Sequence, residues 1–101
     1  MEYHSVLSKV SYVLDQYIYY KLVPEKGYAY QVTDRDLVIR YKFVETLPTN
    51  CTVEVYQEKR CQLFDFLRKA AKVMIQLDAY AKITIQQCNS QGEEEFVEEV
   101  Y

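Results

Sequence analysis

Glycine and proline are scarce in this chain of 101 residues, which has only two of each and no tryptophan. Such a low content of both residues excludes collagen-like and low-complexity chains. The two glycines, Gly27 and Gly92, are too far apart to build a dinucleotide-binding turn or a phosphate-binding loop. The only histidine, His4, lies in the first turn of an expected helix, where ends fray, and is poorly placed as the base of a catalytic pair.

The cysteines are few and show no paired spacing. Cys51, Cys61 and Cys88 form no Cys-x-x-Cys motif, whereas structural zinc sites usually draw their ligands as closely spaced pairs. Asp78 falls on the apolar side of an expected helix, where a buried carboxylate would be a candidate general acid, but we expect it to reach solvent or a backbone donor instead. The sequence therefore predicts a protein that is not an enzyme, with no catalytic residue, metal ligand, cofactor or small-molecule substrate.

Long hydrophobic runs are also absent. No apolar stretch approaches the roughly 20 residues that a membrane-spanning helix needs. The first five residues are polar and lack the basic start and apolar centre of a secretory signal. We therefore expect a soluble cytoplasmic protein without membrane contact, in which the odd number of cysteines stays reduced.

Negative charge is concentrated at one end of the chain. The formal net charge is −3, yet residues 93–101 hold five glutamates and no base, which leaves ten acids against twelve bases in residues 1–92. A mildly basic body with an acidic segment differs from a uniformly acidic protein. This asymmetry, together with the break at Asn89–Gly92, predicts a compact domain of residues 1–92 and an acidic tail of residues 93–101.

Half of the residues are apolar, and their spacing predicts both helices and strands. Apolar residues three and four apart indicate helices, and alternating apolar residues indicate half-buried strands. The turn Thr33–Asp36 joins two of these strands into an antiparallel hairpin. The expected helices span residues 2–21 and 61–81, and the expected strands span residues 28–33, 37–44, 51–59 and 82–86.

The expected order is α-β-β-β-α-β in a single α+β domain. The simplest arrangement places both helices on one face of an antiparallel sheet. The other face of the sheet is expected to be solvated. The residues expected on that open face are Arg40, Lys42, Glu54 and Tyr56.

Two groups of aromatic and apolar residues are candidate protein contacts. Tyr12 and Tyr19 are seven residues apart and project away from the apolar stripe of the first helix. Tyrosine combines a rigid apolar ring with a polar tip and is enriched at interfaces. In the tail, Phe96 and Val100 are four residues apart, as are Val97 and Tyr101, so a bound helix would show an apolar edge. The alternatives for the tail are a final strand and an unbound acidic segment. We hypothesise a small inhibitor or adaptor that binds a protein partner or associates with itself.

A basic face on the second helix supports an alternative hypothesis. Cations on this face would contact phosphates, and nearby tyrosines would stack on bases. The excess of two positive charges in residues 1–92 is small for a nucleic-acid-binding module. The residues that would carry this function are Lys59, Arg60, Arg68, Lys69 and Lys72.

Overall fold

The computed structural model describes residues 2–77 and 80–101, with the side chains of residues 6–77 and 80–101. This part of the chain forms helices and strands in the order α-β-β-α-β-β. The elements are α1 (Glu2–Tyr19), β1 (Tyr28–Thr33), β2 (Asp36–Lys42), α2 (Val53–Gln76), β3 (Lys82–Cys88) and β4 (Glu94–Val100). The expected α+β class, the first hairpin and the strand at 82–86 are confirmed.

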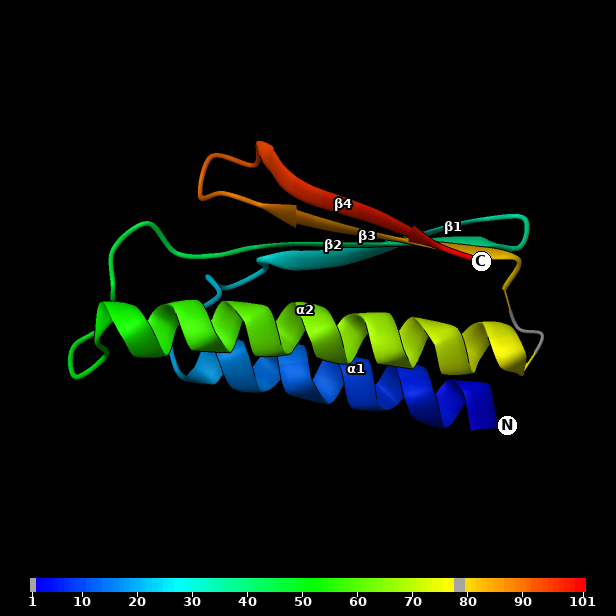
Figure 1. Ribbon diagram of the computed structural model, residues 1–101, viewed down its shortest axis with the longest axis horizontal. Coiled ribbons are helices and arrows are strands. Elements are labelled where there is room, and N and C mark those ends of the chain that lie inside the picture. The colour runs from blue at the N-terminus through cyan, green and yellow to red at the C-terminus, as the bar shows by residue number, and fades with distance from the viewer. Residues whose placement is uncertain (1, 78–79) are drawn as a thin grey trace.

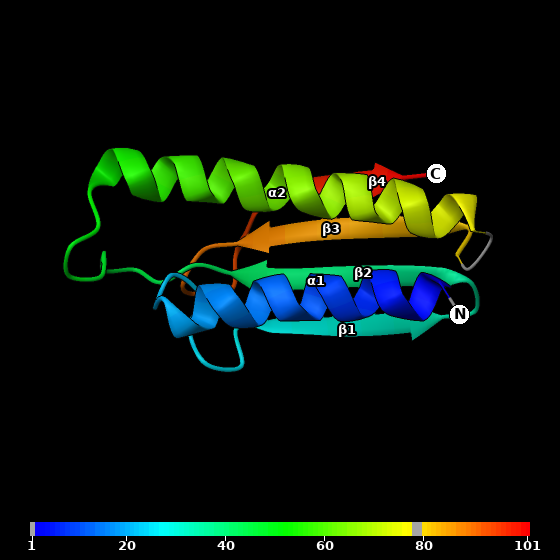
Figure 2. The same cartoon turned by 90° about the horizontal axis from the view of Figure 1, so that it is seen from below.

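The four strands form one sheet in the order β1-β2-β3-β4. The outer pairs are antiparallel but β2 and β3 are parallel, so the predicted antiparallel sheet is wrong at its centre. Parallel neighbours need a crossover connection, and α2 provides it. Both helices cover one face of the sheet, as expected (Figure 1). Seen from below, α1 runs along β1 and β2, and α2 runs along β3 and β4 (Figure 2).

The predicted strand at 51–59 is wrong because the chain is already helical from Val53. Thr52 is the N-cap of α2, and its side-chain oxygen accepts a hydrogen bond from the Val55 backbone N–H at 3.1 Å. A capping threonine satisfies a helix N–H that would otherwise lack a partner. The alternating Val53 and Val55, which suggested a strand, are exposed on the first turn. Glu54 and Tyr56, expected on the open sheet face, therefore lie on α2.

The core lies between the sheet and the two helices. Alternate residues of β2 and β3 face the helices, so that Leu37 is level with Ile83 and Ile39 with Ile85. All four side chains are fully buried. Burial of this kind stabilises the fold by roughly 1.5–3 kcal/mol for each large apolar side chain. The helices contribute Val10, Leu14, Leu63, Leu67, Ala71 and Met74 to the same core.

The acidic segment 93–101 forms an edge strand of the sheet. Strand β4 pairs with β3 from Val100, opposite Ile83, to Glu94, opposite Cys88, with an irregularity between Gln87 and Cys88. Val100 is buried, with only 6% of its surface exposed. Of the alternatives considered for this segment, the final strand is the one that the structure contains.

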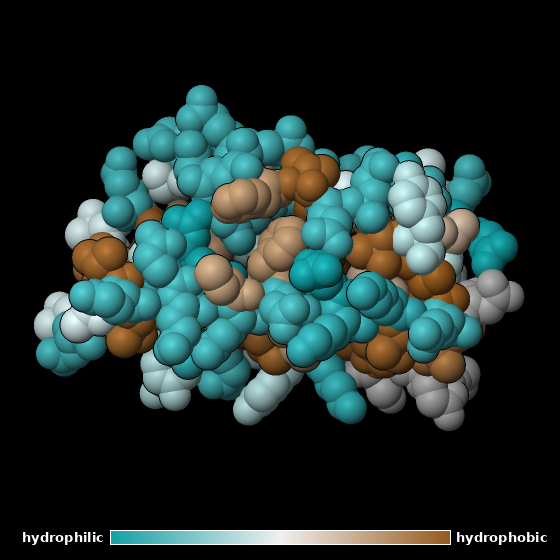
Figure 3. All heavy atoms as spheres, in the orientation of Figure 1, coloured by the Kyte–Doolittle hydropathy of each residue, from teal (hydrophilic) through white to brown (hydrophobic). Residues whose placement is uncertain are grey.

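The face of the sheet turned away from the helices points to the top of the view in Figure 3, where it is seen edge-on and its visible side chains are mostly hydrophilic. Arg40 and Lys42 lie on it, as expected. The Arg40 guanidinium donates to the side-chain oxygen of Gln86 at 3.0 Å and to the Gly92 carbonyl at 2.6 Å. Neither helix, within its described residues, is long and apolar enough to cross a membrane.

Candidate protein-binding surface

Helix α2 is longer than the sheet that it covers. Its 24 residues span about 36 Å at 1.5 Å per residue. A strand of seven residues spans only about 23 Å. The first turns of α2 therefore extend beyond the ends of the strands, beside the connection from β2 (Figure 1). Within the part of the chain that the structure describes, no strand covers this end of the helical layer.

A groove of about 580 Å³, which we call the end groove, lies at this overhang. Its lining comes from the end of α1 and the turn that follows it, the connection before α2 and the first two turns of α2. The lining residues are Gln16, Tyr17, Tyr20, Leu22, Pro48, Thr49, Asn50, Cys51, Val55 and Lys59.

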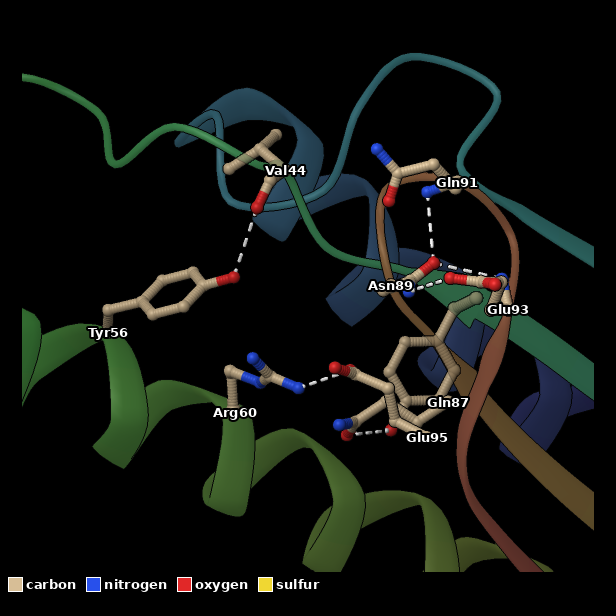
Figure 4. A network of polar contacts seen from close by, with 9 residues as sticks. Val44, Tyr56, Arg60, Gln87, Asn89, Gln91, Glu93 and Glu95 are labelled. Atoms are coloured by element: carbon tan, nitrogen blue, oxygen red, sulfur yellow. Dashed lines mark hydrogen bonds and ion pairs between the residues drawn. The ribbon is translucent and has the colours of Figure 1, made fainter.

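The walls of the end groove are held by hydrogen bonds between distant segments. The Tyr17 hydroxyl donates to the Lys59 carbonyl at 2.8 Å and so ties α1 to α2. Partial burial raises the pKa of the Tyr17 hydroxyl above its ordinary value. The Tyr56 hydroxyl donates to the Val44 carbonyl at 3.1 Å and anchors the connection (Figure 4). The groove is thus preformed by the fold.

Apolar side chains stay exposed around the end groove. Tyr19 and Tyr20 are 74% and 61% exposed, and their rings meet edge to face at 5.1 Å between centroids. Val53 and Val55 are exposed on the facing turn of α2. Figure 3 shows hydrophobic side chains at this left-hand end of the molecule. Exposed apolar residues that cluster around a groove indicate a contact surface, whereas single ones do not.

The two tyrosines proposed from the sequence lie on different parts of α1. Tyr19 is at the helix end and belongs to the rim of the end groove. Tyr12 is two turns away and is also exposed. It lines a shallow groove between α1 and β1 that includes Ser11 and Tyr30. The structure therefore does not join Tyr12 and Tyr19 into one surface.

The apolar residues of β4 do not form the helical edge expected for a bound tail. Val100 is buried in the core, whereas Phe96 and Val97 are exposed. The Phe96 ring lies 6.4 Å from that of Phe64 on α2, between centroids. Tyr101 is exposed beyond the strand, and its hydroxyl donates to Glu99 at 2.8 Å. In a strand, neighbouring side chains alternate between faces, so Phe96 and Val97 point to opposite faces of the sheet.

Most cations of the basic face are paired with carboxylates. Arg60 bonds Glu95 on β4 at 2.5 Å, and Arg68 bonds Glu98 at 2.9 Å. Lys69 pairs with Asp65 on its own helix at 3.0 Å. Strand β4 thus places two of its acids over the basic side of α2. Of the remaining two candidates, Lys59 lines the end groove and Lys72 is exposed.

The described residues offer little for metal or nucleophilic chemistry. They contain no group of three or more histidine, cysteine or acidic side chains suited to a metal ion. All three cysteines are free, and burial raises the pKa of the Cys88 thiol, which disfavours the reactive thiolate. The His4 side chain and Asp78 lie outside the described part of the chain.

Sequence reasoning missed Tyr20, Val53, Val55 and the connection at Pro48–Cys51 as parts of one surface. A usable signal was present in Thr52, a preferred N-cap residue that stands before the helical spacing of Tyr56 and Leu63. No protein-family model, curated protein or solved structure matches the chain.

Proposed function

We propose that this is a small non-catalytic binding protein, of inhibitor or adaptor type, that acts by protein–protein contact through the end groove. The observation that carries the proposal is a preformed groove lined by the exposed side chains of Tyr20 and Val55, with exposed Tyr19 and Val53 close to them in the chain. Aromatic anchors in water-excluding pockets supply much of the energy of protein interfaces. Because the groove is preformed, a partner can bind without a large loss of conformational entropy in the residues that line it.

The partner that fits this surface presents one or two apolar side chains to the groove. Lys59 lines one side of the groove, and an acidic residue next to the apolar anchor would pair with it. The three free cysteines are compatible with a cytoplasmic setting.

The nucleic-acid alternative has less support. Arg60, Arg68 and Lys69 pair with carboxylates of the same chain, and phosphates would have to compete with these pairs. Only Lys59 and Lys72 among the five candidates have no such pair among the described residues. Phosphate contacts also make binding strongly salt-dependent. Retention of RNA or DNA at low salt, lost in a Lys59→Ala/Lys72→Ala variant, would favour this alternative.

The proposal is tested by comparing two double variants in quantitative pull-downs from an extract of the native host. Tyr20→Ser/Val55→Ser removes one aromatic and one valine from the end groove. Phe96→Ser/Val97→Ser removes the same kinds of side chain from β4 and is the matched control. All four side chains are exposed, so both variants should remain folded, which circular dichroism checks.

We expect proteins that bind the wild type to be lost with the end-groove variant and retained with the β4 variant. The Kd of an isolated partner should rise by at least about tenfold, or about 1.4 kcal/mol, in calorimetry. The site is wrong if the β4 variant loses the partner and the end-groove variant keeps it. The function is wrong if the wild type enriches no protein over the Tyr20→Ser/Val55→Ser variant.

A further inference from the structure

The two edges of the sheet have very different side chains. Strand β4 carries Glu94, Glu95, Glu98 and Glu99, and its edge is therefore protected by negative charge. Strand β1, with the sequence YAYQVT, has no charged side chain and no proline. Natural proteins protect edge strands with charge, proline or a covering segment because unpaired edges associate. The β1 edge has neither of the first two.

The outward backbone groups of β1 follow from its pairing with β2. The Lys42 N–H donates to the Gly27 carbonyl at 2.9 Å, and residues 28–33 continue in the same antiparallel register. In an antiparallel ladder, residues that exchange backbone hydrogen bonds with the partner strand alternate with residues that do not. Residues 29, 31 and 33 therefore bond β2. The N–H and C=O groups of Tyr28, Tyr30 and Val32 therefore point away from the sheet. Among the described residues, no other strand pairs with this edge.

Two side-chain hydrogen bonds fix how α1 lies along this edge. The hydroxyls of Tyr30 and Ser11 share a hydrogen bond at 2.8 Å, and the Tyr28 hydroxyl donates to Asp15 at 2.9 Å. The centre of β1 at Tyr30 is therefore level with the middle of α1. A shallow groove of about 420 Å³ runs between them. It is lined by Leu7, Ser8, Ser11, Tyr12, Asp15 and Tyr30.

We propose that the β1 edge binds a second copy of this chain, antiparallel about a two-fold axis at Tyr30. In that arrangement Tyr30 faces its own copy, and Tyr28 faces Val32 of the other chain. All three outward residues then exchange backbone hydrogen bonds, and the two sheets become one sheet of eight strands. Such a pairing closes on itself as a two-fold dimer and leaves the acidic β4 edges at the outside.

The spacing of the helices supports a second copy as the occupant. Each helix covers two strands, a width of about 9.6 Å at 4.8 Å per strand. Packed helices prefer axis separations of about 8–10 Å. Continuing the sheet across the two-fold axis therefore brings the two α1 helices to packing distance, just as α1 and α2 are within one chain. Tyr12 and Ser8, which line the α1–β1 groove, are exposed in a single chain and would lie near this contact.

Charge-swapped edge variants test the pairing directly. Ala29 and Gln31 are exposed on the open face of β1, and the two-fold pairing sets Ala29 of one chain opposite Gln31 of the other. Like charges directly opposite on neighbouring strands are destabilising, and opposite charges are stabilising. The variants are Ala29→Lys/Gln31→Lys and Ala29→Glu/Gln31→Glu, each measured alone and as an equal mixture by sedimentation velocity.

We expect the wild type to be dimeric, each charged variant alone to be monomeric, and the mixture to recover the dimer. Unchanged far-ultraviolet circular dichroism would show that each variant is folded. A wild type that stays monomeric up to about 1 mM, a concentration that reveals even weak association, overturns the proposal. A dimer that persists in both charged variants also overturns it, since the contact must then lie elsewhere. Tyr20→Ser/Val55→Ser should remain dimeric, which separates this inference from the end groove.

Discussion

Arg60 on α2 and Glu95 on β4, 35 residues apart in the sequence, form an ion pair with 2.5 Å between nitrogen and oxygen. The Arg60 guanidinium also lies over the Phe43 and Tyr56 rings, 4.9 and 5.5 Å from their centroids. Figure 4 shows Arg60 reaching from the helix toward Glu95. The side chain is only 18% exposed, so its interactions are poorly screened by water.

Replacing Arg60 should destabilise the fold. We expect Arg60→Ala to lower the free energy of unfolding by about 1.5–3 kcal/mol, because a charged hydrogen bond and two cation–π contacts are lost. Urea denaturation measures the change. The control is Lys69→Ala, whose ion pair with Asp65 is exposed, and we expect it to cost less than about 0.5 kcal/mol. Equal effects of the two substitutions would contradict the special role of Arg60.

Strand β4 should be required for stability. Val100→Ala removes buried apolar surface opposite Ile83, and we expect a loss of about 1.5 kcal/mol at roughly 0.8 kcal/mol per methylene-sized group. Val97→Ala, on an exposed residue of the same strand, should change stability by less than about 0.5 kcal/mol. Thermal unfolding compares them. A chain that lacks residues 93–101 and melts like the wild type would show that β4 is dispensable.

The buried pair Tyr41 and Gln87 should show non-additive mutant effects. The Tyr41 hydroxyl donates to the Gln87 side-chain oxygen at 3.0 Å, and both residues are buried. We expect Tyr41→Phe to cost about 1–3 kcal/mol, because it leaves a buried amide oxygen without its donor. Tyr41→Phe/Gln87→Leu should recover much of that loss, since neither polar group remains. A double-mutant cycle in urea measures the coupling, and strictly additive costs would contradict it.

Alkaline pH should destabilise the protein through Tyr30. Burial raises the pKa of Tyr30 from 10.0 to about 12, so the folded state holds the phenolic proton more tightly than the unfolded state. The resulting stability is complete below about pH 10 and is lost as the pH rises through about 12. We expect the free energy of unfolding to fall in this window, and to fall less in Tyr30→Phe. Tyr12→Phe, at an exposed site, is the control and should follow the wild type.

A glycine after α1 should stabilise the chain. Lys21 has a φ of 66°, and its N–H and that of Leu22 donate to the Ile18 and Tyr17 carbonyls at the helix end. A left-handed backbone is strained for a residue with a Cβ atom and relaxed for glycine. We expect Lys21→Gly to raise the free energy of unfolding by about 0.5–1 kcal/mol. Lys9→Gly, inside α1, should lower it by a similar amount of about 1 kcal/mol, which thermal unfolding would show.

Local patterns accounted for α1, the first hairpin and β3. Val10 and Leu14 are buried as their helical spacing predicts, and the alternation of residues 37–42 places Leu37 and Ile39 in the core. The start of α2 was misassigned because Val53 and Val55 alternate like a strand, although tertiary contacts bury Tyr56 and Leu63 at helical spacing instead. Three alternating residues, Cys51, Val53 and Val55, are too few to distinguish a strand from the start of a helix. The N-cap residue Thr52 does distinguish them.

By itself the sequence determined the class of the fold, most of its elements and the separation of its charges, because periodicity and composition act over neighbouring residues. Only the tertiary structure decided that β2 and β3 are parallel and that the acidic segment is an edge strand. It also brought Tyr20 and Val55 to one groove and left β1 as an uncharged edge. These features depend on which distant segments pack together. The packing of these segments is determined by the apolar surface buried and the strands paired over the whole chain.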